Sequence, residues 1–212
     1  MNRRDCIASV VLTCATWASH AQATPAGGPS ILVVGDSISA EYGLARGTGW
    51  VTLLEKQLAA DKVPARVVNA SVSGDTTSGG RSRLPALLKS HQPTHVILEL
   101  GANDALRGLA LKNTEDNLAW MTEQAQKAGA KVTLVGMQVP PNYGARYGEQ
   151  FAGVFPAVAK KYGTALVPFL LKGVADDPDP TRWFQADRIH PSAQAQPRLL
   201  ANVWPVLKPQ LK

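Results

Sequence analysis

Short apolar runs alternate with longer amphipathic stretches along most of the chain. Five runs have the length and β-branched content of buried strands, and they are Ile31–Val34, Arg66–Asn69, His95–Leu100, Lys131–Val135 and Ala165–Val167. Apolar positions recur at helical spacing over residues 49–61, 79–90, 114–128, 148–162 and 192–207. Strands that alternate with helices favour a parallel sheet covered on both faces. The pattern therefore predicts an α/β fold, a three-layer α/β/α sandwich around a five-stranded parallel sheet.

Glycine and proline refine the expected helix ends. Gly129 follows the third helix, where a residue without a side chain favours a left-handed C-cap. Pro197 and Pro205 are predicted to bend or shorten the last helix, because proline lacks the amide hydrogen that a helix uses. We find no internal repeat or dividing linker in the 212 residues, so residues 24–212 are predicted to form one domain.

The first 23 residues have the composition of a secretory signal peptide. "MNRR" is a short basic head, Cys6–Ala18 is an uncharged apolar run, and "AQA" at 21–23 resembles a cleavage site. We expect cleavage after Ala23 and a periplasmic or secreted protein. The run is too short for a membrane anchor, and no later stretch reaches spanning length, so no stable membrane insertion is expected. Lipidation at Cys14 and twin-arginine export through Arg3-Arg4 are weaker alternatives.

Cysteine content and charge narrow the classes of protein further. Cys6 and Cys14 both lie in the expected signal peptide, so the processed chain is predicted to have neither a disulfide framework nor a thiolate zinc site. The net charge of the whole chain is +6, but its lysines and arginines are scattered. A solvated basic surface is the favoured interpretation, and nucleic-acid binding has no motif to support it.

Conspicuous polar residues follow the ends of four predicted strands. Ser37 follows the first strand, Gly74 follows the second, and Asn103 follows the third. The segment after the fifth strand ends in "DRIHPS", which contains Asp187 and His190. Ligands of open α/β sheets bind beyond the carboxyl ends of the strands. These residues are therefore predicted to meet in one site.

The residue types at this edge are those that a serine hydrolase requires. Such an enzyme needs a nucleophile, a base, a group that orients the base, and donors for the oxyanion. His20 lies in the expected signal peptide. His91 lies just before the third strand and His95 at its start, at the wrong end of the sheet, which leaves His190 as the base for Ser37. Asp187 is one tight turn away and can orient the imidazole. The N–H groups of Ser37 and Gly74 and the amide of Asn103 are predicted to donate to the oxyanion.

Each of these residues also has a structural explanation when it is taken singly. A serine after Gly-Asp is often a helix cap, a loop glycine permits a positive φ, and Asp-x-x-His is usually a surface pair. Four such features in chain order at one sheet edge favour catalysis instead. Asp36 is predicted to brace the turn around Ser37 by hydrogen bonding to nearby backbone, without a catalytic role.

The ordered motifs resemble the SGNH (GDSL) hydrolases. Gly-Asp-Ser, the loop glycine, Gly-x-Asn-Asp and Asp-x-x-His-Pro are the blocks of that family, and "GDSISAEYGL" and "PPNYGARYGEQF" resemble its periplasmic acyl-CoA thioesterases, lysophospholipases and arylesterases. The resemblance covers essentially all of residues 24–212. It implies a flavodoxin-like SGNH hydrolase fold and hydrolysis of carboxylic esters and thioesters through an acyl-serine intermediate. It also implies the roles of Ser37, His190, Asp187, Gly74 and Asn103 given above.

Three residues depart from the family pattern. Ala102 and Arg188 stand where glycine is usual, and Ser192 replaces an asparagine. Ala102 is a small change if its φ is negative. Arg188 places a cation between Asp187 and His190, where it either coats the edge of the site or favours anionic head groups.

Loops after the third and fourth strands offer an apolar lining for an acyl chain. The candidate residues are Leu106, Leu109, Met137, Val139, Pro140 and Tyr143. An equally weighted interpretation is that they only cover the edge of the core. We expect a monomer that acts on a small-molecule acyl ester, acyl thioester or lysophospholipid, with no metal or other cofactor. A polysaccharide O-acetylesterase on the same fold and a non-enzymatic flavodoxin-like binding module are the alternatives.

Overall fold

A computed structural model describes residues 28–211 and contains one parallel sheet. The expected signal peptide and both cysteines lie outside these residues. The strand order is β2-β1-β3-β4-β5, with every neighbouring pair parallel. The strands are β1 (Ser30–Gly35), β2 (Arg66–Asn69), β3 (His95–Glu99), β4 (Lys131–Val135) and β5 (Ala165–Val167). The five predicted strands are confirmed, with ends that differ by at most one residue.

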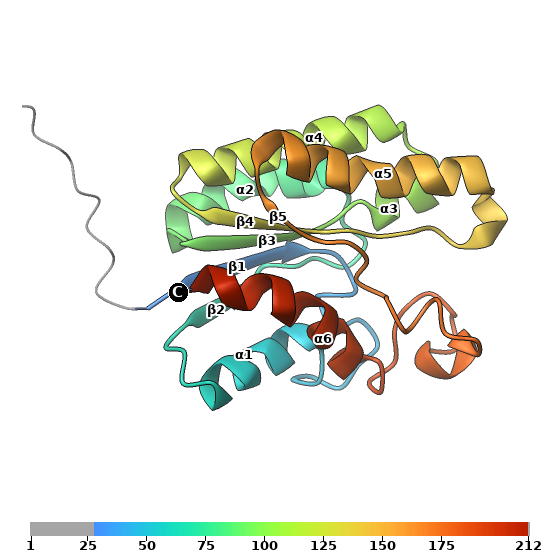
Figure 1. Cartoon of the computed structure of the whole chain (residues 1–212), viewed down its shortest axis with the longest axis horizontal. Helices are drawn as coiled ribbons and strands as arrows, with labels where there is room; N and C mark the ends of the chain where they lie inside the picture. Colours follow the sequence, from blue (N-terminus) through green and yellow to red (C-terminus); the bar gives the residue numbers. More distant parts are fainter. Residues whose placement is uncertain (1–27, 212) are drawn as a thin grey trace, which may run out of the picture.

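Helices cover both faces of the sheet, as predicted for a three-layer sandwich. Figure 1 shows α2, α4 and α5 on one face and α1 and α6 on the other. The bounds are α1 (Trp50–Ala60), α2 (Thr77–His91), α3 (Ala102–Leu106), α4 (Leu111–Lys127), α5 (Ala145–Tyr162) and α6 (Gln196–Leu207). Short 3₁₀ helices are η1 (Pro141–Tyr143), η2 (Pro180–Trp183) and η3 (Lys208–Leu211).

The core lies on both sides of the central strands. All five residues of β3 are buried, and so are the last five of β1, because both of their faces are covered by helices. The edge strand β2 is only partly buried. Trp50 at the start of α1 is inaccessible to solvent, and Phe151 and Phe155 of α5 meet edge to face at 5.4 Å between ring centroids. The apolar runs of the sequence therefore form the centre of the sheet.

Two features of the helices differ from the sequence prediction. The short helix α3 was not expected, because five residues are too few to show a helical period. Pro205 lies inside α6, which continues to Leu207, whereas Pro197 occupies the first turn, where its missing amide hydrogen is not needed.

The predicted end of the third long helix is confirmed. Gly129 has a φ of 86°, the left-handed conformation expected just after α4.

Strand order places a switch point next to β1. The chain passes from β1 outward to β2 and then returns to β3 on the other side of β1. Loops that leave β1 and β3 at this point diverge onto opposite faces of the sheet (Figure 1), and ligands of open α/β sheets bind beyond the carboxyl ends at such a point. Ser37 follows β1 and Asn103 follows β3, so both lie at this switch point.

Candidate active site

Ser37 lies in a tight turn directly after the central strand β1. The Asp36 carboxylate accepts a hydrogen bond from the Ile38 N–H at 3.0 Å, and the Asp36 carbonyl accepts one from the Ala40 N–H at 3.0 Å. Ser37 is 9 % exposed. The turn thus holds the serine hydroxyl at a nearly buried position on a rigid strand end. This is the bracing role that the sequence assigns to Asp36.

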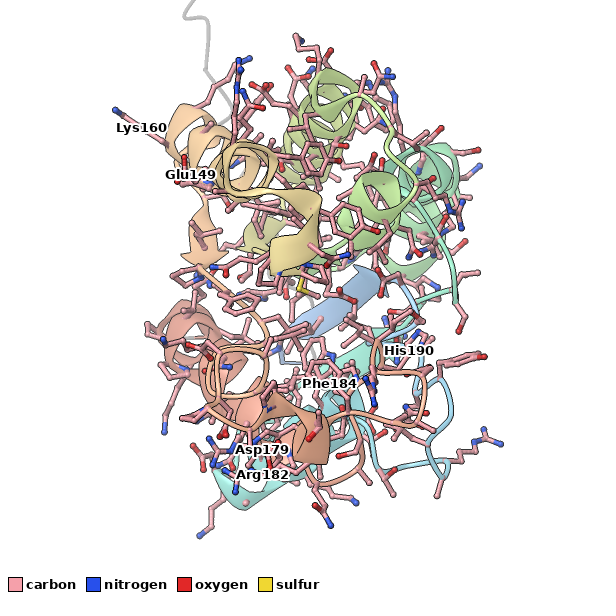
Figure 2. All side chains as sticks on the ribbon, turned by 90° about the vertical axis from the view of Figure 1, so that its right-hand side faces the viewer. Glu149, Lys160, Asp179, Arg182, Phe184 and His190 are labelled. Atoms are coloured by element: carbon pink, nitrogen blue, oxygen red, sulfur yellow. The ribbon has the colours of Figure 1, made fainter. Side chains whose placement is uncertain are left out.

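Ser37, His190 and Asp187 form one hydrogen-bonded chain. His190 Nε2 lies 2.9 Å from Ser37 Oγ, and His190 Nδ1 lies 2.6 Å from Asp187 Oδ2. The other oxygen, Asp187 Oδ1, accepts the His190 N–H at 3.0 Å. Figure 2 shows His190 on the edge that faces the viewer, where the strands end. The structure brings these three residues together in the order that the sequence predicts.

Electrostatics keep the Asp187 carboxylate ionised. Burial raises the pKa of Asp187, but the hydrogen bonds from the imidazole and the backbone of His190 outweigh this and lower the pKa to about 2. An ionised carboxylate on Nδ1 fixes the tautomer in which Nε2 is free to accept the Ser37 proton.

Tyr42 and Gln185 hold the histidine segment against the serine turn. The Tyr42 ring lies 4.4 Å from the His190 ring, centroid to centroid. The Gln185 N–H donates to the His190 carbonyl at 2.8 Å, and the Gln185 side chain donates to the Tyr42 carbonyl at 2.8 Å. Gln185 therefore joins two segments that are 143 residues apart. Neither residue was predicted from the sequence, because Gln185 belongs to no motif and the motif that contains Tyr42 does not show which segment its ring packs against.

Two backbone N–H groups are free to face an oxyanion. Within residues 28–211, the N–H groups of Ser37 and Gly74 form no hydrogen bond. Gly74 has a φ of 77°, and a Cβ atom at this position would meet only the Arg107 guanidinium, at 3.7 Å. Ser37 lies in a nearly buried turn, where backbone N–H groups usually have a partner, and Gly74 lies in a half-buried loop. Two N–H groups that have none suit the oxyanion-hole role that the sequence assigns to them.

Asn103 has internal partners for its side-chain amide in this structure. Nδ2 donates to Asp36 Oδ2 at 3.1 Å and to the Asp75 carbonyl at 3.0 Å. One turn later, Arg107 donates to the Gly74 carbonyl at 2.8 Å. Residues of the α3 segment thus hold two consecutive carbonyls of the loop that carries Gly74. For Asn103 to donate to an oxyanion, one of its two hydrogens must be shared with, or released from, these acceptors.

A pair of buried acids lies behind the serine turn. Glu99 Oε2 accepts the Ser39 hydroxyl at 2.6 Å and the Asp36 N–H at 3.3 Å. Burial raises the pKa of Asp36 to about 6, with the Ile38 N–H and the charge of His190 acting in the opposite direction. Burial and the neighbouring charge of Asp36 raise the pKa of Glu99 well above its usual value. Burial therefore disfavours the charged form of both carboxyl groups.

The departures from the family pattern have different structural settings. Ala102 begins α3 with a negative φ, so glycine is not required there. Arg188 has a φ of 59°, in the left-handed region that favours glycine, which explains why glycine is usual at this position. The Ser192 hydroxyl is buried without a partner; nothing in the structure explains its replacement of asparagine.

The predicted acyl-binding residues divide into two groups. Leu106, Leu109 and Tyr143 are exposed by 37–41 % and Pro140 is also exposed, so these side chains are accessible beside the site. Val139 is half-buried, and Met137 is 5 % exposed and packs in the core. The structure therefore offers no open surface at Met137.

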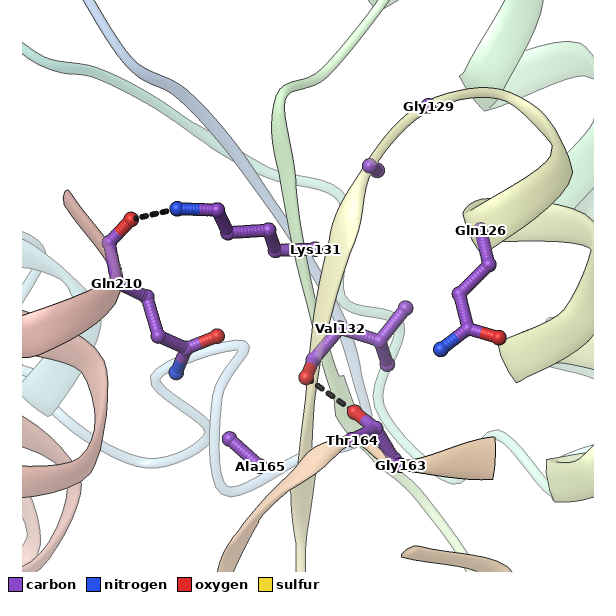
Figure 3. Close-up of a pocket in the computed structure, with 9 residues that line it drawn as sticks. Gln126, Gly129, Lys131, Val132, Gly163, Thr164, Ala165 and Gln210 are labelled. Atoms are coloured by element: carbon purple, nitrogen blue, oxygen red, sulfur yellow. Dashed lines mark hydrogen bonds between the residues drawn. The ribbon is translucent and has the colours of Figure 1, made fainter. Parts of the chain in front are cut away.

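Two surface hollows lie away from these residues. Figure 3 shows one of about 480 Å³ near the amino ends of β4 and β5, where Lys131 donates to the Gln210 carbonyl. The other, of about 550 Å³, lies between α1 and α6 and is lined by Leu53, Leu200 and Trp204 among others. Neither contains a predicted site residue.

Metal-binding and membrane-spanning features are absent from the described part of the chain. Residues 28–211 contain no group of three His, Cys, Asp or Glu side chains arranged to hold a metal ion. None of the helices in this range combines the length and the apolar character needed to cross a membrane.

The fold and the Ser37-His190-Asp187 arrangement define a serine hydrolase of the α/β class with its site at the switch point. A family model described as the GDSL-like Lipase/Acylhydrolase family matches residues 33–197. The chain belongs to this family and is an ester-hydrolysing enzyme, as the sequence motifs predict. The non-enzymatic alternative is therefore wrong.

Known relatives extend the match to nearly the whole chain. An esterase, TesA of Pseudomonas aeruginosa, is 52 % identical over 206 residues, which covers 97 % of this chain and 96 % of that protein. Thioesterase 1/protease 1/lysophospholipase L1 of Escherichia coli is 42 % identical over 170 residues, with coverages of 79 % and 78 %. The crystal structure of the psychrotrophic esterase EstA from Pseudoalteromonas sp., inhibited by monoethylphosphonate, has a TM-score of 0.80 at 37 % identity, with coverages of 86 % and 98 %.

Proposed function

We propose that Ser37 attacks the acyl carbon of carboxylic esters and thioesters, with His190 as base and Asp187 as the group that orients it. The observation that carries this proposal is the hydrogen-bonded chain Ser37 Oγ–His190 Nε2–Asp187, at 2.9 and 2.6 Å. These distances allow proton transfer to the imidazole without rearrangement.

The reaction then follows in two halves. As Ser37 Oγ bonds to the acyl carbon, His190 Nε2 takes its proton, and the former carbonyl oxygen becomes an oxyanion. The free N–H groups of Ser37 and Gly74 stabilise that charge, with Asn103 as a third donor. His190 returns the proton to the departing alcohol or thiol. In the second half, His190 takes a proton from water as the water oxygen bonds to the acyl carbon. The bond from that carbon to Ser37 Oγ then breaks, His190 returns the proton to Oγ, and the acid leaves.

We also propose that the enzyme accepts several classes of acyl substrate. The apolar residues Leu106, Leu109 and Tyr143 are exposed in segments that follow β3 and β4, so they can accommodate acyl chains of several lengths. Its relatives include an esterase and a protein named as a thioesterase and lysophospholipase. We therefore propose aryl esters, acyl-CoA and lysophospholipids as substrates of this protein, and the periplasm or exterior as its location after signal cleavage at Ala23.

An acyl-length series tests the proposed activity. Rates on p-nitrophenyl esters from acetyl to palmitoyl are compared with rates on acyl-CoA and lysophospholipid, with the Ser37→Ala variant as a control. We expect turnover across several acyl lengths and on both ester and thioester bonds. Activity on acetyl esters alone would contradict the broad acyl specificity and favour the O-acetylesterase.

A further inference from the structure

Exposed large apolar side chains gather at the catalytic edge. Within residues 28–211, all such side chains lie in segments that follow the carboxyl ends of the strands, with exposures of 37–53 %. We call this set the rim; its members are Tyr42, Val72, Leu106, Leu109, Tyr143 and Ile189. Apolar residues scattered singly over a surface need no explanation, whereas a concentration at one edge marks an interaction surface.

The rim is wider than one acyl chain requires. Leu106, Leu109 and Tyr143 follow β3 and β4, on one side of β1. Val72 follows β2, on the other side of β1, and Ile189 adjoins His190. A single acyl chain bound at Ser37 extends in one direction. Apolar side chains on both sides of Ser37 therefore point to contact with a broader apolar phase.

The charged groups near the rim are arranged asymmetrically. Carboxylates of the loops after β1 and β2 have internal partners: Glu41 accepts the N–H groups of Gly47 and Gly49, and Asp75 pairs with Arg83. Glu149, near the start of α5, is exposed and forms no salt bridge within residues 28–211. Exposed arginines on the same edge form no salt bridge within the part of the chain that is described, and they are Arg46, Arg107, Arg146 and Arg188. The acidic segment that contains Asp179 lies apart from His190, as Figure 2 shows.

Arg188 is the most unusual of these cations. It keeps a left-handed backbone, with a φ of 59°, in the turn that joins Asp187 to His190. A long side chain at a position that favours glycine is strained, and strain of this kind is retained where the side chain has a use. The position fits a cation that meets an anionic group on the substrate side of His190.

We propose that the rim docks the catalytic edge peripherally on the surface of anionic lipid aggregates. Its apolar side chains enter the lipid–water boundary, and Arg107 and Arg188 contact phosphate head groups. An ester lipid can then reach Ser37 without first dissolving as a monomer. The proposal rests on the proposed esterase function for its purpose, but binding itself requires no catalysis.

Vesicle sedimentation tests the docking separately from hydrolysis. The Ser37→Ala protein is mixed with vesicles of phosphatidylglycerol or of phosphatidylcholine, so that lipid is not consumed. We expect binding to the anionic vesicles that weakens with added salt, and much weaker binding to phosphatidylcholine. Val72→Ser/Ile189→Ser should lower binding about tenfold, and Arg188→Gln about fivefold.

Matched variants away from the rim serve as controls. Lys160→Gln removes a cation from the distant end of α5, where Figure 2 labels it. Leu200→Ser removes an apolar group from the hollow between α1 and α6, the other apolar surface described above. A thermal melt of each variant confirms folding. We expect both controls to bind like the parent protein.

The outcomes separate docking from the esterase proposal. Lack of binding to anionic vesicles, or equal losses in the rim and control variants, would overturn the docking surface and leave the esterase untouched. In the active background, Val72→Ser/Ile189→Ser should keep turnover of soluble p-nitrophenyl butyrate within about twofold and lose rate on micellar lysophosphatidylglycerol. An equal loss of rate on both substrates would also overturn the docking surface.

Discussion

Histidines lie at both ends of the sheet, in opposite chemical settings. At the amino end, His95 is 6 % exposed, with Nδ1 at 2.8 Å from the Thr94 hydroxyl and Nε2 at 2.9 Å from the Gln210 carbonyl. At the carboxyl end, His190 joins a carboxylate and a hydroxyl. A carbonyl can only accept a hydrogen bond, whereas a serine hydroxyl can give its proton away. The partner on Nε2 thus separates a structural histidine from a candidate base.

The electrostatic surroundings of the two histidines also differ. Burial lowers the pKa of His95, which keeps that imidazole neutral and fixed in the core. His190 instead lies beside an ionised Asp187, which stabilises the imidazolium formed when Ser37 attacks. Two histidines of one fold therefore differ in whether their surroundings accept a positive charge.

Substitution of His190 is expected to have the largest effect on kcat. His190→Ala should lower kcat by roughly 10⁴–10⁶-fold, because no other group can accept the Ser37 proton. His95→Ala should leave kcat nearly unchanged and lower the melting temperature, since it removes two partly buried hydrogen bonds. Turnover per folded molecule and a thermal melt measure both. A greater loss of kcat in His95→Ala than in His190→Ala would reverse the comparison.

Substitution of Asn103 is expected to have the next largest effect on kcat. Asn103→Ala should lower kcat and kcat/KM together by about 10²–10³-fold, because the donor matters most once the oxyanion has formed. Asn103→Asp should be at least as slow. The internal bonds of Asn103 to Asp36 and Asp75 make a structural role the competing explanation. A melt lowered by several degrees with near-normal kcat would support that competitor.

The acid pair behind Ser37 should give a pH-dependent stability. The pKa of Asp36 is raised to about 6 by burial, so the folded state holds its proton more tightly than the unfolded chain does. Its contribution to stability is complete below about pH 4 and is lost as pH rises through 6. The melting temperature of Asp36→Asn, measured relative to the parent protein, should therefore be lower at pH 4 than at pH 7.5. A difference that stays constant with pH would contradict the raised pKa.

Substitution of Arg188 is expected to have the smallest effect, and this effect is on stability rather than on catalysis. Arg188→Gly should stabilise the fold by about 1 kcal/mol, because glycine adopts the left-handed backbone without strain. For a chain of this size, that corresponds to a rise in melting temperature of about 2–4 °C. A melting temperature that falls would show that the Arg188 side chain makes contacts that outweigh the strain.

Local sequence patterns predict the parts of the molecule that depend on short-range information. The apolar runs predicted the strands, and their ends predicted the edge at which Ser37, Gly74, Asn103 and His190 meet. They could not show bonds between distant segments, such as Gln185 with Tyr42, or the shared burial of Asp36 and Glu99. Nor could they show that Arg188 adopts a left-handed φ, since only the usual glycine hinted at it. These features depend on tertiary contacts that local spacing does not encode.

Covalent labelling of the purified enzyme tests the central claim most directly. An ethylphosphonate ester should react once per molecule, and peptide mass spectrometry should locate the phosphorus on Ser37, with loss of all esterase activity. Ser37→Ala should take up no label, whereas His95→Ala should react at the parent rate. A label on a neighbouring serine such as Ser39 or Ser71, or full activity in the enzyme labelled at Ser37, would contradict the assignment of Ser37 as nucleophile.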